Sequence, residues 1–264
     1  MRNVLALTKK ELYIYFSTPI AYVAFFATSF IAAFVFLSAT SAFQRQVLQY
    51  MQYQQPEVME RLNLTDMVAL PLILNMGVIL IFIAPFLSMR LFAEEHRGKT
   101  IELLMTMPIR SVEIVLGKYF AALVMVAVYV GLVAVFPLIL HVYGASASGA
   151  GGIEWQTVGL GLFGLFLLGA AFVSLGLFVS ALTESQVVAA LLTFLILFLS
   201  WVIGWKAGEV DGIWKDVFTH LSSVTHLVSF SRGSLDLKDL VYYLSVVVLG
   251  LFLTHRALEA RRWA

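Results

Sequence analysis

The chain has 264 residues, of which 61% are hydrophobic and 12% charged, and its mean hydropathy is +0.91. Soluble domains are nearer to half apolar and a quarter charged, so this composition indicates a polytopic membrane protein. The net charge of +1 gives no indication of nucleic-acid binding, and the absence of cysteine excludes disulfides, thiol chemistry and cysteine-ligated metals.

The first 18 residues predict an amphipathic helix that lies along the membrane surface. Apolar side chains are interspersed with Lys9, Lys10 and Glu11, and Pro19 ends the segment. The alternative is that this helix simply lengthens the first span. The apolar run that follows is too long for the core of a signal peptide, so we expect the first span to be retained.

Six apolar segments are long enough to cross a membrane as helices. A spanning helix needs about 20 apolar residues, because it rises about 1.5 Å per residue across a hydrocarbon core about 30 Å thick. The expected spans are residues 19–43, 69–92, 112–143, 156–182, 186–205 and 238–258. Runs of this length exclude barrel strands, so we predict an all-α membrane protein with six transmembrane helices.

The distribution of basic residues predicts the orientation. Most of the 17 Lys and Arg residues lie in the N-terminal segment, between spans two and three, and in the C-terminal segment. The segments after spans one, three and five hold most of the acidic residues. By the positive-inside rule, we expect a multi-pass protein of the inner (cytoplasmic) membrane with both termini in the cytoplasm.

The segment at residues 93–100, AEEHRGKT, ends in Gly-Lys-Thr but does not match a phosphate-binding loop. That loop has glycine where Ala93 stands and points backbone N–H groups at phosphate oxygens. Here Glu94 and Glu95 would place two carboxylates beside the nucleotide. We therefore expect no nucleotide site, no cofactor and no enzymatic activity in this chain.

Residues 94–106 predict a short amphipathic helix between spans two and three. Ile101, Leu104 and Met105 follow helical spacing, and Pro108 ends the run. Such a helix can dock on a soluble partner, and the alternative is an interfacial turn whose basic residues only anchor the protein. Glu184, in the short turn between spans four and five, is either a helix-terminus charge or a second contact with the same partner.

Residues 206–237, between spans five and six, are expected on the outer side of the membrane but hold many apolar side chains. They predict re-entrant helices dipping partway into the outer leaflet, and the alternative is a surface helix. His220 and His226 lie six residues apart with no obvious partner carboxylate, so they do not predict a metal site.

The interiors of the spans predict close packing and no proton relay. Five glycines in span four permit close helix approach: Gly159, Gly161, Gly164, Gly169 and Gly176. Asp, Glu, Lys and Arg are almost absent from the span interiors, which disfavours an ion-coupled carrier.

Three stretches carry a resemblance to a known family. They are LTKKELYIYFSTPIAYV (residues 7–23), FAEEHRGKTIELLMTMPIRSVEIVLGKYFAA (92–122) and HLVSFSRGSLDLKDLVYYLSVVVLGLFLTHRALEARRW (226–263). They resemble the ABC-2 type permeases, which are membrane subunits of ATP-binding-cassette transporters, and most of all the gliding-motility and copper-enzyme-maturation subgroup. One departure is Lys99, which stands where many relatives have glycine directly before the threonine.

The resemblance implies one ABC-2 type transmembrane domain over residues 1–264. Residues 1–18 would be an elbow helix, 94–106 a cytoplasmic coupling helix, and 206–237 an external re-entrant segment. The coupling helix would sit in a cleft of a separate ABC ATPase subunit, present in two copies and holding ATP and magnesium. A second permease chain, identical or related, would pair with this one. The residues expected to contact the ATPase are Glu94, Glu95, His96, Arg97, Gly98, Lys99, Thr100, Glu102, Leu103, Leu104 and Glu184.

The leading hypothesis is therefore a permease subunit that couples ATP hydrolysis by its partner to export or to a membrane-associated assembly process. An ATP-independent channel or scaffold is the alternative. An intramembrane enzyme is a further alternative, although the spans show no recognisable set of catalytic residues. The expected surroundings are the lipid bilayer, the ATPase and the second permease chain, without nucleic acid.

Overall fold

The computed structural model describes residues 2–53, 63–106, 109–144, 153–206 and 212–262, without the side chains at positions 20, 103–105, 144, 261 and 262. Within these ranges the regular elements are helices, and no strand occurs, which confirms the predicted all-helical class. The elements are α1 (Arg2–Ser17), α2 (Pro19–Gln52), a π-helical turn η1 (Thr65–Ala69), α4 (Leu70–Ser88), α5 (Arg90–Arg97), α6 (Ile101–Thr106), α7 (Ser111–Gly144), α8 (Trp155–Leu182), α9 (Gln186–Lys206), α10 (Ile213–Leu221), α11 (Ser223–Ser231) and α12 (Leu237–Arg262).

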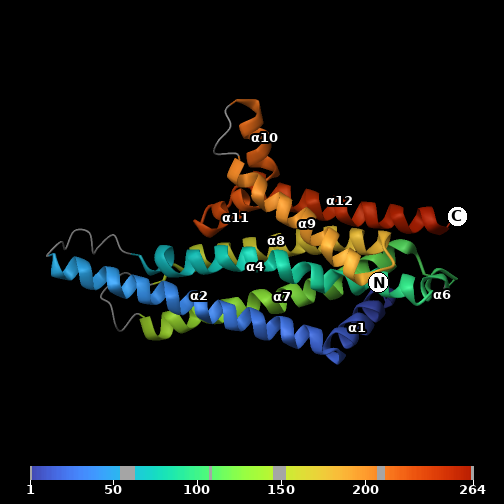
Figure 1. Cartoon of the computed structure of the whole chain (residues 1–264), viewed down its shortest axis with the longest axis horizontal. Coiled ribbons are helices and arrows are strands. Elements are labelled where there is room, and N and C mark those ends of the chain that lie inside the picture. The colour runs from blue at the N-terminus through green and yellow to red at the C-terminus, as the bar shows by residue number, and fades with distance from the viewer. Residues whose placement is uncertain (1, 54–62, 107–108, 145–152, 207–211, 263–264) are drawn as a thin grey trace.

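Six helical segments in the described residues are long and apolar enough to cross a membrane, as predicted. They are α2, η1 to α5 taken together, α7, α8, α9 and α12 (Figure 1). Their ends agree with the expected spans to within a few residues, except at two places. The first span continues past residue 43 as far as Gln52, and span two continues through α5 to Arg97.

The chain breaks between α1 and α2 because of Pro19. Proline lacks a backbone N–H and disfavours the helical conformation in the residue before it. Thr18 accordingly is extended, with φ of −105° and ψ of 140°, and Pro19 opens α2. α1 therefore leaves the line of the first span at an angle, as Figure 1 shows. It is a separate helix and does not extend the span.

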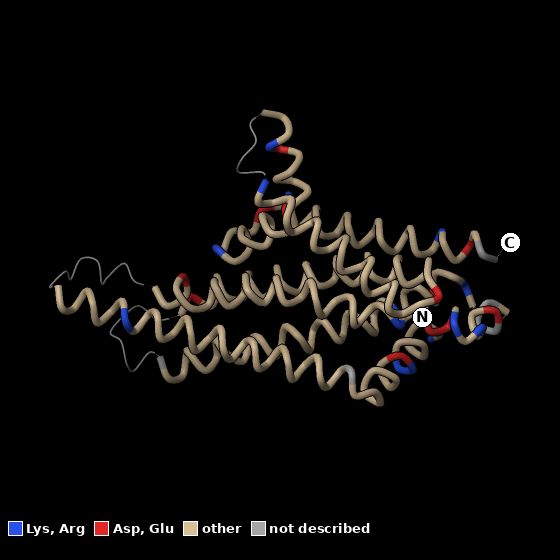
Figure 2. The backbone as a smooth tube through the Cα atoms, viewed as in Figure 1, with Lys and Arg blue, Asp and Glu red and all other residues tan. Residues whose placement is uncertain are grey.

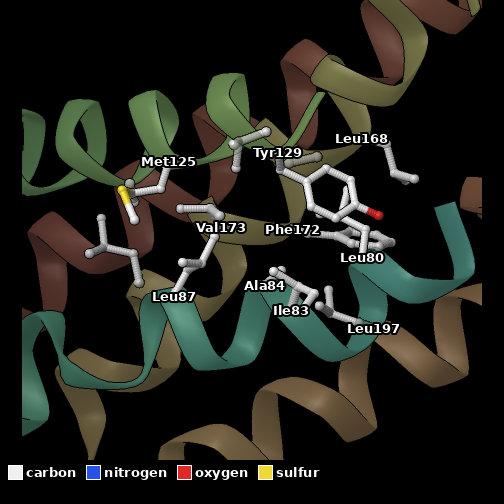
Figure 3. Packing of buried hydrophobic residues seen from close by; sticks show 14 of the residues in the cluster. Leu80, Ile83, Ala84, Leu87, Met125, Tyr129, Leu168, Phe172, Val173 and Leu197 are labelled. Carbon is white, nitrogen blue, oxygen red and sulfur yellow. The ribbon is translucent and has the colours of Figure 1, made fainter. Parts of the chain in front are cut away.

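The apolar core lies where α4, α7 and α8 meet. Leu80 and Ala84 of α4, Tyr129 of α7 and Phe172 of α8 are buried together (Figure 3). The Tyr129 hydroxyl donates a hydrogen bond to the Met76 carbonyl at 2.6 Å, which satisfies a polar group in the apolar interior. α8 is the most buried span, so it forms the centre around which the others pack.

Glycines set how closely α8 approaches its neighbours. A Cβ atom would lie 2.7 Å or less from a side-chain atom of another helix at Gly161, Gly164, Gly169 and Gly176. This agrees with the packing role predicted for these positions. Gly159 differs, because a Cβ there would meet nothing within 4 Å. It lies on the exposed side of α8, whereas its neighbour Val158 is buried.

The segment predicted to be re-entrant contains α10 and α11, while residues 207–211 lie outside the described part. α10 projects sideways from the bundle in Figure 1 and buries none of its residues. α11 packs against α8, α4 and α9, and Leu227 and Phe230 are buried. The two helices therefore differ: α11 belongs to the bundle, and α10 is attached at its edge.

Charged residues gather at one end of the bundle. Figures 1 and 2 place both termini, α5 and α6 at this end, with many of the Lys, Arg, Asp and Glu residues. The middles of the long helices carry almost none. The bundle therefore has one strongly charged end, and the segment predicted to bind a partner lies there.

Candidate functional site

The predicted docking segment is a helix, a turn and a second helix. α5 ends at Arg97, and α6 begins at Ile101. The turn between them has a cause in the backbone: the Thr100 N–H donates to the Glu95 carbonyl at 3.0 Å, and the Lys99 N–H donates to the His96 carbonyl at 3.1 Å. These two bonds form a Schellman motif, which ends a helix. Residues 94–106 are thus divided between two helices and are not one continuous helix.

Lys99 occupies the position of this motif that glycine normally takes. Its φ of 53° lies in the left-handed region, and it is the non-glycine residue with positive φ among those described. Glycine adopts this conformation without steric cost, whereas other residues pay about 1–2 kcal/mol. The left-handed conformation therefore gives a physical reason for the glycine that the family resemblance implies at this position.

Lys99→Gly is therefore expected to stabilise the turn. The net gain is at most about 1 kcal/mol, because glycine also loses more backbone entropy on folding. Hydrogen exchange at the Thr100 amide should slow, and the melting temperature should rise slightly. Lys99→Ala is the matched control, since it removes the same side chain but keeps the strained conformation. An equal change in both variants would show that the side chain, and not the backbone, is responsible.

The Gly-Lys-Thr sequence does not offer the free backbone N–H groups of a phosphate loop. The N–H groups of Gly98, Lys99 and Thr100 all donate to carbonyl groups of α5. A phosphate loop instead presents the N–H groups at a helix N-terminus. Among the described residues, no cluster of side chains suited to a metal ion occurs either.

The predicted docking residues divide into outward-facing and inward-facing sets. Seven are exposed at the surface: Glu94, Arg97, Gly98, Lys99, Thr100, Glu102 and Glu184. Glu95 and His96 instead face the bundle. The side chains of Leu103 and Leu104 lie outside the described part of the structure. The outward set can meet a partner, and the inward pair connects that set to the spans.

Glu95 belongs to a buried network of ion pairs. The Lys118 ammonium at the start of α7 lies 2.8 Å from Glu95 Oε1 and 2.9 Å from Glu11 Oε1 of α1. The side chains of Lys118, Glu11 and Glu95 are only 1%, 7% and 13% exposed. The half-exposed Lys10 lies 3.5 Å from Glu95 and 3.6 Å from Glu11. We call these four residues the ionic junction; it joins α1, α5 and α7.

A small polar cleft opens beside the ionic junction. Its volume is about 180 Å³, and its lining includes Arg90, Glu94 and Thr100 together with the four junction residues. Glu95 Oε2 is buried with no hydrogen-bond partner among the described residues. The cleft thus lies between the outward-facing docking residues and the first helix of the chain.

Comparison with known families decides what kind of protein carries this site. The sequence profile of the family described as ABC-2 family transporter protein matches residues 6–227. The chain belongs to the ABC-2 transporter family. A comparison with curated proteins finds no match.

Membership fits the fold and gives the docking segment a context. ABC-2 proteins are the multi-pass membrane components of transporters and normally work with an ATPase subunit. The match begins within α1 and includes the ionic junction and both short helices after span two. It ends in α11, so α12 lies beyond it.

A second set of contacts joins the predicted docking segment to span four. The Ser180 hydroxyl accepts hydrogen bonds from the Phe92 and Ala93 N–H groups at 3.0 and 3.1 Å and donates to the Met89 carbonyl at 2.9 Å. His96 Nε2 lies 3.1 Å from the carbonyl oxygen of Ala181. α5 is therefore attached to the end of α8, close to the turn that carries Glu184.

Arg90 attaches α5 to the break between α1 and α2. Its guanidinium donates to Thr18 Oγ1 at 2.8 Å, lies over the ring of Tyr15, and pairs with Glu94 at 3.5 Å. Burial raises the pKa of Tyr15 well above its usual range, so the hydroxyl stays protonated and donates to the Leu87 carbonyl. α1 is thus held to span two at both its middle and its end.

Sequence reasoning did not find the partners of Glu95. In the sequence Lys118 counts only as one of the basic residues that set membrane orientation, and Glu11 only as a polar residue of an amphipathic helix. The two residues lie 107 positions apart in the sequence. A signal existed in principle, because a lysine near the edge of an apolar span needs a buried counter-charge. Which carboxylate supplies that charge depends on the packing of α1 against α7.

Proposed function

We propose that this chain is the permease subunit of an ATP-driven ABC-2 transporter and that α5, the turn at Lys99 and α6 dock on its ATPase. The ionic junction is the observation that carries the proposal. It gives α5, on which we propose the docking surface, a buried link to the spans. Arg97 and Glu95 lie two residues apart on α5, one exposed and the other in the junction.

Movement of the docking segment would pass into the spans by three connections. Glu95 leads to Lys118 of span three and to α1, Ser180 leads to span four, and Arg90 leads to the start of span one. Breaking a buried ion pair by separating its partners is costly, because it leaves a charge without a counter-charge. A push on α5 is therefore expected to move these helix ends together and not to dissipate in a flexible loop.

The assembly that fits this proposal has two ATPase subunits and a second permease chain, identical or related. ATP and magnesium would be bound by the ATPases. The charged end of the bundle would face the cytoplasm, together with both termini, in the inner membrane. α1 would serve as the elbow helix along that surface, and α10 with α11 would lie in the outer leaflet. The conformational work would serve export or a membrane-associated assembly process, as in the gliding-motility and copper-enzyme-maturation subgroup.

ATPase recruitment tests the proposal directly. The chain would be expressed with its genomic neighbours and purified in detergent through an affinity tag. We expect a soluble nucleotide-hydrolysing subunit to copurify with the wild type. The triple variant Arg97→Glu, Lys99→Glu, Glu102→Lys should bind it more than about tenfold less tightly, since like charges across an interface cost several kcal/mol.

Arg45→Glu is the matched control, because Arg45 is an exposed charge near the far end of α2 and the net charge changes by the same amount. It should leave recruitment unchanged. Equal loss in both variants would contradict docking at α5 and α6. Absence of any ATPase from the wild type would favour the ATP-independent channel or scaffold.

A further inference from the structure

A second buried charged pair lies at the opposite end of the bundle from the ionic junction. His226 of α11 and Asp239 of α12 are almost fully buried, and His226 Nδ1 lies 2.6 Å from Asp239 Oδ1. The other ring nitrogen, Nε2, lies 3.1 Å from the carbonyl oxygen of His220. His220 is in the last turn of α10, so one imidazole ring joins three helices.

The partners of the two ring nitrogens fix how many protons the pair holds. A carbonyl oxygen only accepts hydrogen bonds, so Nε2 must carry a proton. An ionised carboxylate also only accepts, so Nδ1 must carry a second proton when Asp239 is ionised. If the pair held one proton fewer, two acceptors would face each other at 2.6 or 3.1 Å. Both contacts are satisfied by an imidazolium beside a carboxylate, or by a neutral imidazole with its proton on Nε2 beside a protonated carboxyl group.

Three neighbouring features favour this charged form. The ring of Tyr242 stacks on His226 with 4.0 Å between centroids, which favours a cation on the ring face. Asp239 lies in the first turn of α12, where the helix dipole favours a negative charge. The His220 carbonyl lies at the C-terminal end of α10, where the dipole favours a positive charge.

We propose that His226 and Asp239 form a proton-binding site and that the imidazolium formed there holds α10 in its place on the bundle. α10 buries none of its residues and leaves Ile213 82% exposed, and its other attachments are contacts with α9 and the link through Ser222 to α11. A second bond runs from the Tyr242 hydroxyl to the Leu221 carbonyl at 3.1 Å. Loss of the proton leaves His226 bonded to Asp239 but turns Nε2 into an acceptor facing the His220 carbonyl, which releases the end of α10.

The surroundings of the site contain few other titratable groups. Among the described residues, Asp239, Tyr242 and Tyr243 lie against His226. The elements packed on α11 also carry Lys206 on α9, Lys215, Asp216 and His220 on α10, and Lys238 on α12; Arg232 and Asp236 lie in the connection between α11 and α12. α4 and α8 contribute none. This inference concerns the far end of the bundle and does not depend on an ATPase partner.

The protonation state can be measured directly by nitrogen-15 NMR of the protein labelled in its five histidines. The resonance of His226 is assigned by its loss in His226→Gln. From the two acceptors that face the ring, we expect both ring nitrogens of His226 to be protonated in the wild type. Asp239→Asn should make the ring neutral, because the asparagine amide can donate to Nδ1 while Nε2–H still donates to His220. A neutral His226 in the wild type would overturn the proposal.

The position of α10 is measured by the distance between two spin labels. The chain has no cysteine, so Asp216→Cys on α10 and Ser245→Cys on α12, both exposed, give two unique labelling sites. In reconstituted wild type the distance distribution should be narrow where the NMR spectrum shows both ring nitrogens of His226 protonated, and broad where it shows one proton lost. In His226→Gln it should be broad throughout, since both N–H donors of glutamine are on one nitrogen and the two acceptors contact different nitrogens of the imidazole.

Asp239→Asn separates the proposal from a general effect of pH on the protein. Its distance distribution should stay narrow at every pH, because both contacts are then made without the additional proton. If the wild type and Asp239→Asn respond to pH in the same way, or if His226→Gln leaves the distribution narrow, the imidazolium does not hold α10.

Discussion

Lys118→Met is expected to lower the free energy of unfolding by up to about 3–5 kcal/mol, because it removes the buried counter-charge of Glu11 and Glu95 and leaves them only the half-exposed Lys10. Methionine is close to lysine in length and suits the apolar environment, so lost packing contributes little. The measurement is thermal unfolding of the purified protein in one detergent, with folding followed by circular dichroism. The melting temperature should fall by several degrees at least.

A combined variant distinguishes charge from packing as the cause. In Lys118→Met, Glu11→Gln, Glu95→Gln the three buried members of the junction are neutral, and only the half-exposed Lys10 keeps its charge. Stability should return to within about 1 kcal/mol of the wild type, since replacing a buried ion pair completely is often neutral. Lys215→Met, at an exposed lysine on α10, should change stability by no more than about 0.5 kcal/mol. If the combined variant is as unstable as Lys118→Met, the ion pairs are not the reason for the loss.

The combined variant also tests whether the junction transmits movement from the ATPase to the spans. It keeps the fold but removes the electrostatic link between α5 and the start of span three. If the proposed function is right, the ATPase should still be recruited through Arg97 and Lys99, while its hydrolysis should no longer drive movement of the spans. Recruitment and transmission would then be separate properties of neighbouring residues on one short helix.

Gly250→Leu is expected to cost at least about 1–3 kcal/mol by forcing α12 away from α8. A Cβ atom at position 250 would lie 2.8 Å from the backbone carbon and oxygen of Ser174. Backbone atoms of a buried helix cannot rotate aside as a side chain can, so the helices must separate. The contact between α8 and α12 is the most extensive between any two elements, and its loss should appear as a lower melting temperature and faster proteolysis.

Gly131→Leu is the matched control in another span. A Cβ atom at Gly131 of α7 would meet nothing within 4 Å, and the residue is exposed on the outside of the chain. Leucine there adds apolar surface and helix propensity, so stability should be unchanged or slightly higher. A similar loss at both positions would show that the substitution itself, and not the approach of α12 to α8, is responsible.

The spans and their order follow from the sequence because their causes are local. A bilayer offers no partner to an open backbone, so each long apolar run must be a helix, and its length alone shows that it can cross. Pro19 marks the break after α1 for an equally local reason. The two places where the predicted ends were too short, at Gln52 and Arg97, are polar helical extensions, which an apolar-run criterion does not register.

The location of the candidate docking segment was also predictable, but the roles within it were not. Charge, spacing and family resemblance all point to residues 94–106. They give no reason to separate Arg97, which is exposed, from Glu95 and His96, which face the spans. That separation depends on which side of α5 meets α1, α7 and α8.

The sequence by itself determined that this chain is a six-span helical membrane protein with its charges at the ends of the bundle, because hydrocarbon excludes open backbone and unpaired charge from every segment alike. Only the tertiary structure decided that Lys118 pairs with Glu11 and Glu95, and that His226 has Asp239 as its carboxylate partner. A buried charge must find a counter-charge, but the sequence does not show which one helix packing brings within 3 Å of it.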